Sequence, residues 1–176
     1  GLWLSGRDAP LPIYGPTETL QVARSLLELF DLAERAGMFS LEWHPVPLRQ
    51  GRRVLELGGV RIMAAPAVHG QVETIALRFE NTATGRAIVY SADTEPCAAV
   101  VRLALGADLL IHEAAGDHTG HSTPAQAAEI GREAGVARLA LIHYPVRGLN
   151  LETWRLAAAE FPGPVDLAHD GSIYEL

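Results

Sequence analysis

Four apolar runs in this chain each end in a side chain that can bind a metal ion or transfer a proton, and this pattern constrains the fold most. Residues 60–68 end at His69, residues 87–90 lead to Asp93, residues 108–111 end at His112 and Glu113, and residues 139–142 end at His143. Buried strands give way to loops at their carboxyl ends, so side chains there can converge on one cleft. Histidine and carboxylate together are ligands that Zn²⁺ accepts, and a carboxylate can bridge two metal ions.

Each of these residues has a simpler explanation when it is taken alone. A histidine at a strand end is commonly a hydrogen-bonded structural residue, and an aspartate after a strand is commonly a turn former. Thr123, Pro124 and Gln126 have the spacing of a helix cap, so that Ser122 and Thr123 need no catalytic role. The single cysteine, Cys97, excludes an internal disulfide and a cysteine-rich structural zinc site. The spacing alone therefore gives only a metal-site hypothesis.

The amino-terminal half of the chain predicts one helix followed by antiparallel strands. Residues 1–16 resemble a loop with a short apolar piece at 11–14. Apolar residues at three- and four-residue steps from Leu20 to Ala33 predict a helix whose apolar face lies in the core. Thr17 is the expected N-cap of this helix, and Gly37 follows its end. Alternating apolar residues then predict half-buried antiparallel strands at 41–46, 53–57, 60–66, 75–79 and 87–90.

The carboxyl-terminal half changes to an alternation of strands and helices. Helices are predicted at 96–105, from Thr123 to Gly135, and at 151–161. Strands are predicted at 108–111, 138–142, 165–168 and 172–176. No linker, internal repeat or low-complexity tract is recognisable between these elements. We therefore expect one α/β domain over residues 1–176, with helices packed on sheets.

The charge balance and the apolar content limit the partners of the chain. Asp plus Glu number 21 against 14 for Lys plus Arg, which gives a formal charge of −7. This acidic balance argues against broad electrostatic binding of nucleic acid but leaves room for a local basic cleft. No apolar run approaches the ~18 residues that a membrane span needs. Since a lone cysteine also suits a reducing compartment, we expect a cytoplasmic protein without a membrane partner.

Four segments carry a resemblance to a known family. They are Ala-Ala-Pro-Ala-Val-His ending at His69, Tyr-Ser-Ala-Asp-Thr containing Asp93, His-Glu-Ala followed by Gly-His-Ser-Thr, and Arg-Leu-Ala-Leu-Ile-His-Tyr containing His143. Together with Pro-Leu-Pro-Ile-Tyr-Gly-Pro at 10–16, they resemble the metallo-β-lactamase superfamily and its ribonuclease Z-like branch. The resemblance covers essentially the whole chain. It implies an α/β fold of the metallo-β-lactamase type, an αββα sandwich.

The same resemblance implies roles for individual residues. His69 would bind one zinc ion, His143 would bind a second, and Asp93 would bridge the two. His121 would contact the scissile phosphate or protonate the leaving oxygen, and Glu113 would orient His121. The implied cofactor of the intact protein is two Zn²⁺ ions, with Mn²⁺ or Fe²⁺ as alternatives, and the implied nucleophile is a metal-activated water. The remaining histidines are expected to be structural, surface or packing residues, namely His44, His112, His118 and His169.

Three departures from the family pattern qualify the resemblance. The signature His-x-His-x-Asp-His does not occur among the seven histidines. We therefore expect an N-terminally truncated chain, the C-terminal part of a longer hydrolase, that is inactive alone. Only 23 residues separate His69 from Asp93, an interval in which bacterial ribonuclease Z carries a long basic arm that grips transfer RNA. Ala92 and Ala115 stand where the family has glycine and threonine.

The first interpretation of the sequence is a zinc-dependent phosphodiesterase or endoribonuclease of the ribonuclease Z type, acting on a phosphodiester or RNA. One alternative is an arm-less hydrolase of small phosphodiesters or other esters, because one metal site can serve many esters. Another is a non-catalytic pseudo-enzyme that lacks the first metal motif. Because truncation would expose apolar sheet and helix surface, we also expect a homodimer.

Overall fold

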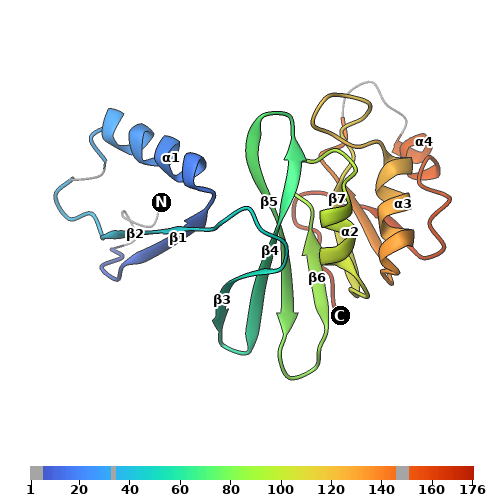
Figure 1. The fold of residues 1–176 in the computed structure, drawn as a ribbon, viewed down its shortest axis with the longest axis horizontal. Helices are drawn as coiled ribbons and strands as arrows, with labels where there is room; N and C mark the ends of the chain where they lie inside the picture. The colour runs from blue at the N-terminus through green and yellow to red at the C-terminus, as the bar shows by residue number, and fades with distance from the viewer. Residues whose placement is uncertain (1–5, 33–34, 146–150) are drawn as a thin grey trace. The chain divides into compact units, whose positions relative to one another are not determined.

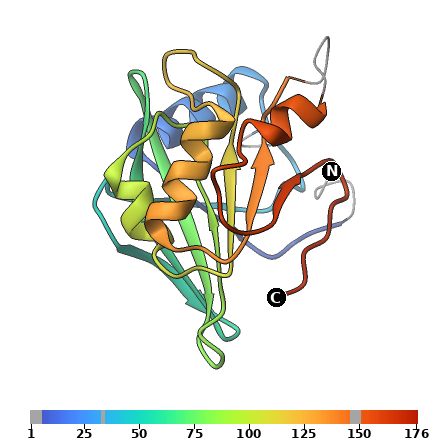
Figure 2. The same cartoon turned by 90° about the vertical axis from the view of Figure 1, so that its right-hand side faces the viewer.

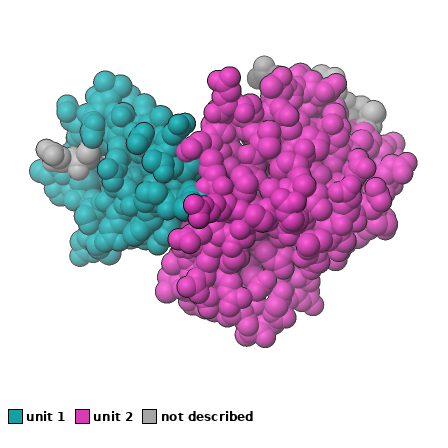
Figure 3. All heavy atoms as spheres, viewed as in Figure 1, with its two compact units in different colours: residues 1–47 teal, residues 48–176 magenta. Residues whose placement is uncertain are grey.

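A computed structural model describes residues 6–32, 35–145 and 151–176 of the chain. The chain divides into two compact units, residues 1–47 and residues 48–176, which Figure 3 shows in two colours. The expectation of a single domain over residues 1–176 stays a prediction.

The first unit contains two strands and one helix, β1 (Leu11–Gly15), α1 (Thr17–Leu29) and β2 (Leu41–Pro45). β1 and β2 pair in parallel, with Leu11 opposite Leu41. The sequence analysis expects a loop at β1 and an antiparallel strand at β2, and both expectations are therefore wrong. The reason is the helix between them, because a helical crossover returns the chain in the same direction and so permits parallel pairing.

Helix α1 differs from its prediction at its start and on its apolar face. Pro16, not Thr17, is the N-cap residue, with φ −56° and no side-chain cap hydrogen bond. The carbonyl of Pro16 accepts the first helical hydrogen bond, from the N–H of Leu20 at 3.0 Å, so the N-cap lies one residue earlier than expected. Leu20 is the one buried residue of α1, whereas Leu26 is 51% and Phe30, just after the helix, 67% exposed. The predicted apolar face is therefore not a core face, and Ala33 lies outside the described residues.

The second unit is built on a seven-stranded sheet in the order β3-β4-β5-β6-β7-β8-β9 (Figure 1). Neighbours from β3 to β6 are antiparallel, as predicted, and neighbours from β6 to β9 are parallel. The strands are β3 (Arg52–Leu57), β4 (Val60–His69), β5 (Val72–Asn81), β6 (Ala87–Tyr90), β7 (Leu109–Glu113), β8 (Leu139–Ile142) and β9 (Val165–Leu167).

The change from antiparallel to parallel pairing follows from the connections. Short turns join β3 to β4, β4 to β5 and β5 to β6, whereas helices α2 (Ala98–Ala104) and α3 (Pro124–Ala134) join the next strands. Helix α4 (Leu151–Leu156), shorter than predicted, precedes β9. The strand predicted at 172–176 is absent, since Gly171 turns the backbone with φ 86° and Ile173 is then 88% exposed, away from the sheet.

Helices α2 and α3 pack side by side on one face of the sheet (Figure 2). Alternate strand residues fill the core beneath them, as the period of two requires, among them Ala65, Ala76, Val89, Leu110 and Leu141. The cap predicted for α3 is confirmed: Thr123 and Gln126 form a reciprocal capping box, and Gly135 ends the helix in the left-handed conformation with φ 61°. No helix in the described part of the chain is both long and apolar enough to cross a membrane.

The strand directions place four carboxyl ends at one edge of the sheet. β4 is antiparallel to β5, and β5 is antiparallel to β6, so β4 runs in the same direction as β6. β7 and β8 continue in parallel with β6. The residues that follow or end these four strands therefore meet at the same edge, as the sequence pattern predicts.

Candidate metal and catalytic site

The side chains of five residues cluster at this edge. The Nδ1 atom of His143 lies 3.0 Å from Oδ1 of Asp93. The ring of His121 lies between two other imidazoles, with ring centroids 4.8 Å from His69 and 5.2 Å from His143. Ligand-capable atoms of His69, Asp93 and His121 all lie within 4.8 Å of one another, and so do those of Glu113, His121 and His143. The structure thus brings together every residue that the sequence analysis places in the site.

Glu113 is a fully buried carboxylate that ties two loops together, the one between β6 and α2 and the one between β7 and α3. Its Oε1 accepts hydrogen bonds from the backbone N–H groups of Thr94 at 3.1 Å and Ser122 at 2.9 Å, and from Nδ1 of His121 at 3.2 Å. Its Oε2 accepts from the N–H of Ala115 at 2.8 Å. Four donors occupy most of the lone-pair positions of one carboxylate, so Glu113 orients His121 rather than offering itself as a ligand.

Three buried hydroxyl groups complete this network. The Oγ atom of Ser91 accepts a hydrogen bond from the N–H of Glu113 at 3.0 Å. The Oγ of Ser122 donates to the carbonyl of Thr94 at 2.7 Å, and Oγ1 of Thr94 accepts from the N–H of Val68 at 3.0 Å. The sequence analysis gave these residues no role in the site; Ser91, directly after β6, is the one of the three that its position next to an apolar strand could have indicated. They fix the loops on which the reactive side chains stand.

Two of the site loops turn through left-handed backbone conformations at residues other than glycine. Ala92 has φ 55° and His143 has φ 54°. Such angles carry a steric cost for any residue with a Cβ atom, and they persist only where surrounding contacts enforce them. The resemblance expects glycine at position 92, and glycine adopts a positive φ without this steric cost. The turn at Ala92 directs Asp93 toward His143.

A second set of contacts holds His69. Its Nδ1 lies 2.9 Å from the carbonyl oxygen of Gly120, and because a carbonyl can only accept, Nδ1 carries the proton and Nε2 keeps a free lone pair. The N–H of Gly120 in turn donates to Oε1 of Glu95 at 2.8 Å. The sequence analysis missed Glu95. Its only sequence signal is its place two residues after Asp93.

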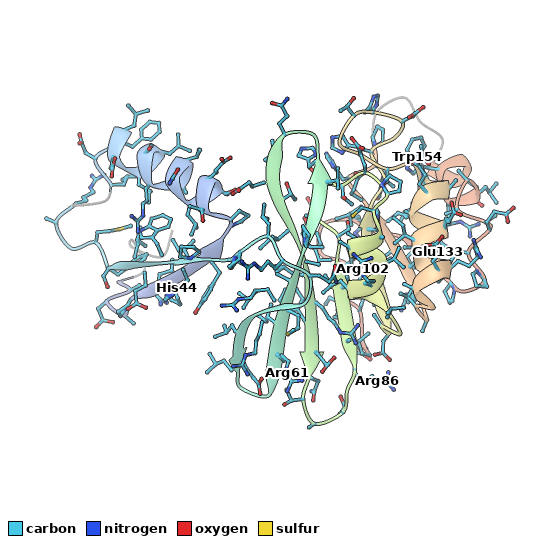
Figure 4. All side chains as sticks on the ribbon, viewed as in Figure 1. His44, Arg61, Arg86, Arg102, Glu133 and Trp154 are labelled. Atoms are coloured by element: carbon cyan, nitrogen blue, oxygen red, sulfur yellow. The ribbon has the colours of Figure 1, made fainter. Side chains whose placement is uncertain are left out.

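The other histidines lie outside this cluster. His112 is fully buried, its Nδ1 donates to the carbonyl of Glu113 at 2.7 Å, and burial lowers the pKa of its imidazole. In the first unit, the ring of His44 (labelled in Figure 4) stacks on Tyr14 with ring centroids 4.7 Å apart. His118 and His169 are exposed. These positions agree with the structural or surface character expected for the four.

The donor set fits a divalent transition metal. His69 and His121 each use Nδ1 in a hydrogen bond, which leaves Nε2 of each ring available. Asp93 and His143 are partly exposed, at 37% and 49% of their side chains, so an ion can reach them. The charge of Asp93 is felt nearby, since burial first and the Asp93 carboxylate second raise the pKa of Tyr90. Imidazole and carboxylate are the protein ligands of catalytic zinc sites.

Comparisons with known proteins agree with this geometry. The family model of the beta-lactamase superfamily domain matches residues 4–144. Ribonuclease Z of Methanothermobacter thermautotrophicus is 30% identical over a match that covers 94% of this chain and 69% of the relative. Ribonuclease Z of Mycobacterium tuberculosis strain H37Ra is 33% identical, with 92% of this chain and 67% of the relative covered.

Solved structures show the same fold. The metallo-β-lactamase fold protein YhfI from Bacillus subtilis matches with a TM-score of 0.71 and 26% identity, covering 94% of this chain and 65% of that protein. The short form of human tRNase Z matches with a TM-score of 0.69 and 22% identity, covering 94% of this chain and 68% of that protein. The chain thus spans about two thirds of the length of these relatives. The family and fold class expected from the motifs are confirmed: the chain belongs to the metallo-β-lactamase superfamily, and to its ribonuclease Z-like branch of hydrolases.

Proposed function

We propose that this chain supplies part of a two-zinc site of a ribonuclease Z-like phosphodiesterase, with His69, Asp93 and His143 as metal ligands and His121 and Glu113 as the acid–base pair. The observation that carries the proposal is the convergence of these five side chains at the carboxyl ends of β4, β6, β7 and β8. Mn²⁺ or Fe²⁺ would suit the same nitrogen and oxygen donors. When bound, a pair of such ions supplies Lewis acidity toward a phosphoryl oxygen and acidifies a bound water.

The contacts of His121 and Glu113 support separate roles for these two residues. Nδ1 of His121 is held by Glu113, so Nε2 of His121 is the atom that can hold a proton or deliver it to a leaving oxygen. The buried carboxylate of Glu113 fixes the ring plane of that imidazole. Helix α3 begins at Pro124, shortly after His121, and the positive end of its dipole favours an anion nearby.

For the substrate, we propose an RNA phosphodiester, because the matched curated relatives are named ribonuclease Z. One observation favours small phosphodiesters as a second candidate. The interval between His69 and Asp93 is filled by the turn at Gly70, by β5, by the turn at 82–86 and by β6, all of which the structure describes. An RNA-gripping arm of the bacterial type has no place in this interval.

Metal binding by the 176-residue chain tests the site. Titration with Zn²⁺, followed by calorimetry and thermal unfolding, should show binding, and a Zn²⁺ excess of about a hundredfold over Kd should stabilise the fold by about 2.7 kcal/mol. The variants His69→Ala, Asp93→Asn and His143→Ala should lose that stabilisation. His169→Ala, which removes an exposed histidine outside the cluster, is the matched control and should retain it. Equal Zn²⁺ stabilisation in all five proteins would contradict the ligand assignment.

Activity is a separate arm of the proposal. We expect no turnover of a chromogenic aryl phosphodiester by the 176-residue chain alone, because it contributes three candidate ligands to a site for two ions. Turnover that disappears in His121→Ala would contradict the expected inactivity while supporting the role of His121. Binding of a transfer RNA precursor that weakens steeply with salt would favour the RNA substrate over small diesters.

The proposal includes a homodimer in the cytoplasm. Exposed apolar side chains on the first unit support self-association, since Leu29 is 75% and Phe30 67% exposed. Light scattering of the purified chain measures its oligomeric state directly. A chain that is still monomeric at about 100 μM would have a dimer dissociation constant above that concentration, which would contradict the proposed homodimer.

A further inference from the structure

We propose that Glu95 is a positioning residue that fixes the imidazole of His69 through the backbone of Gly120. The contacts are direct: the N–H of Gly120 donates to Oε1 of Glu95 at 2.8 Å, and the carbonyl of Gly120 accepts from Nδ1 of His69 at 2.9 Å. The metal-binding part of the inference rests on the proposed function. The orientation of His69 does not.

The contacts form a closed ring that joins three loops. The backbone N–H of Glu95 donates to the carbonyl of Val68 at 2.7 Å, and Val68 precedes His69 at the end of β4. From Val68 the ring passes through the His69 side chain to Gly120 and returns through the Glu95 side chain. Each member is therefore held from two sides, and the His69 ring is fixed relative to the loops that carry Asp93 and His121.

The ring has a chemical consequence for His69. A carbonyl acceptor on Nδ1 selects the tautomer with the proton on Nδ1 and the lone pair on Nε2, as required of an imidazole that ligates a metal through Nε2. Glu95 thus acts on His69 by holding the backbone of one residue, Gly120, in place, without touching the imidazole.

The backbone of Gly120 packs against the imidazole of His69. Gly120 has φ +87°, and a Cβ atom at this position would lie 2.7 Å from Nδ1 of His69. The backbone of Gly120 therefore lies directly against the imidazole, and a side chain at this position would displace one or the other.

The experiment uses the 176-residue chain and three substitutions at Glu95. Glu95→Gln keeps an oxygen acceptor, Glu95→Ala removes it, and Glu95→Asp keeps the charge but shortens the reach. Glu133→Ala, which removes an exposed carboxylate from α3 (labelled in Figure 4), is the matched control. Long-range ¹H–¹⁵N correlation of the histidine rings in metal-free protein reports the His69 tautomer, and Co²⁺ titration followed by visible absorption reports ligation.

We expect a single His69 tautomer, protonated on Nδ1, in the unsubstituted chain, in Glu95→Gln and in Glu133→Ala, and a mixture of tautomers in Glu95→Ala and Glu95→Asp. Co²⁺ affinity should fall about 10–100-fold in Glu95→Ala and stay within about threefold in Glu95→Gln. If Glu95→Ala does not fold, Glu95→Asp supplies the same readout. An unchanged tautomer in Glu95→Ala and Glu95→Asp overturns the inference. Absence of Co²⁺ binding in every protein, with the tautomer pattern as expected, overturns the metal proposal and leaves the positioning role supported.

Discussion

Nδ1 of His143 lies 3.0 Å from Oδ1 of Asp93, although the strands that deliver these residues, β8 and β6, are separated in the sheet by β7. The contact spans one intervening strand because each loop bends inward through a left-handed residue, Ala92 at φ 55° and His143 itself at φ 54°. The site is thus assembled by the turns after the strands as much as by the strands themselves.

The left-handed turn at Ala92 makes a stability prediction. Ala92→Gly removes the steric conflict between Cβ and the backbone, so the free energy of unfolding should stay equal or rise by about 1 kcal/mol, whereas Ala92→Val should lower it by at least about 1 kcal/mol. Urea unfolding measures both. The control is Ala99→Gly within α2, an ordinary helical position, which should lower stability by about 1 kcal/mol. Equal losses for the two glycine variants would contradict the role of φ.

Gly120 makes a second prediction, with another glycine as its control. Gly120→Ala should lower the free energy of unfolding by about 2–4 kcal/mol, because it adds both a strained φ and a Cβ atom 2.7 Å from Nδ1 of His69. Gly135→Ala also carries a positive φ, +61°, but its Cβ would meet no atom within 4 Å, so it should lose only about 1 kcal/mol. Thermal unfolding with circular dichroism compares them, and similar losses would show that crowding of His69 has no effect.

The buried carboxylate of Glu113 leads to a third stability prediction. In Glu113→Gln, the amide NH₂ must face either the N–H of Ala115 or the three donors now bound to Oε1, so at least one buried donor loses its acceptor. We expect a loss of about 1–3 kcal/mol in the free energy of unfolding. Glu129→Gln, which breaks an exposed contact with Arg132, should change stability by less than about 0.5 kcal/mol. Indistinguishable urea midpoints for the two variants would refute the network.

His112 makes a prediction about pH. Burial lowers the pKa of His112 in the folded chain below its ordinary value of 6.5, so the unfolded chain binds the extra proton more readily. Its contribution to stability is therefore complete above pH ~6.5 and is lost as pH falls below that value. His112→Asn, which retains a donor for the carbonyl of Glu113, should flatten the slope of unfolding free energy between about pH 7 and pH 5 by up to about 1.4 kcal/mol per unit. The exposed His169→Asn serves as control, and identical slopes in the two variants would contradict the prediction.

Local patterns predicted those parts of the fold that local chemistry decides. The capping box of Thr123 and Gln126 and the left-handed Gly135 depend on neighbours within a few positions, and all three lie where the sequence predicts them. Strand β1 depends instead on pairing with residues about thirty positions away, so its short apolar segment reads as a loop. The apolar face of α1 had the period of a core helix, but periodicity does not state what, if anything, covers it.

In the candidate site, too, residues marked by local patterns were predictable and residues placed by long-range contacts were not. His69, Asp93, Glu113 and His143 were predictable because each ends or follows an apolar run, and parallel strand directions bring such ends together. Glu95 was not predictable, since its partner Gly120 lies 25 residues away on another loop and no pattern links the two. The order of the motifs predicted the candidate site residues, whereas the groups that orient them emerge only from the folded loops.

The turns at the opposite edge of the seven-stranded sheet are places where the chain can be modified far from the candidate site. The tight turn at Gly58 and Gly59 and the turn at Thr82–Gly85 precede β4 and β6, so a full strand length separates each of them from the candidate site. A short peptide epitope or a fluorescent label grafted between Thr82 and Gly85 should therefore leave the geometry of the five clustered side chains unchanged.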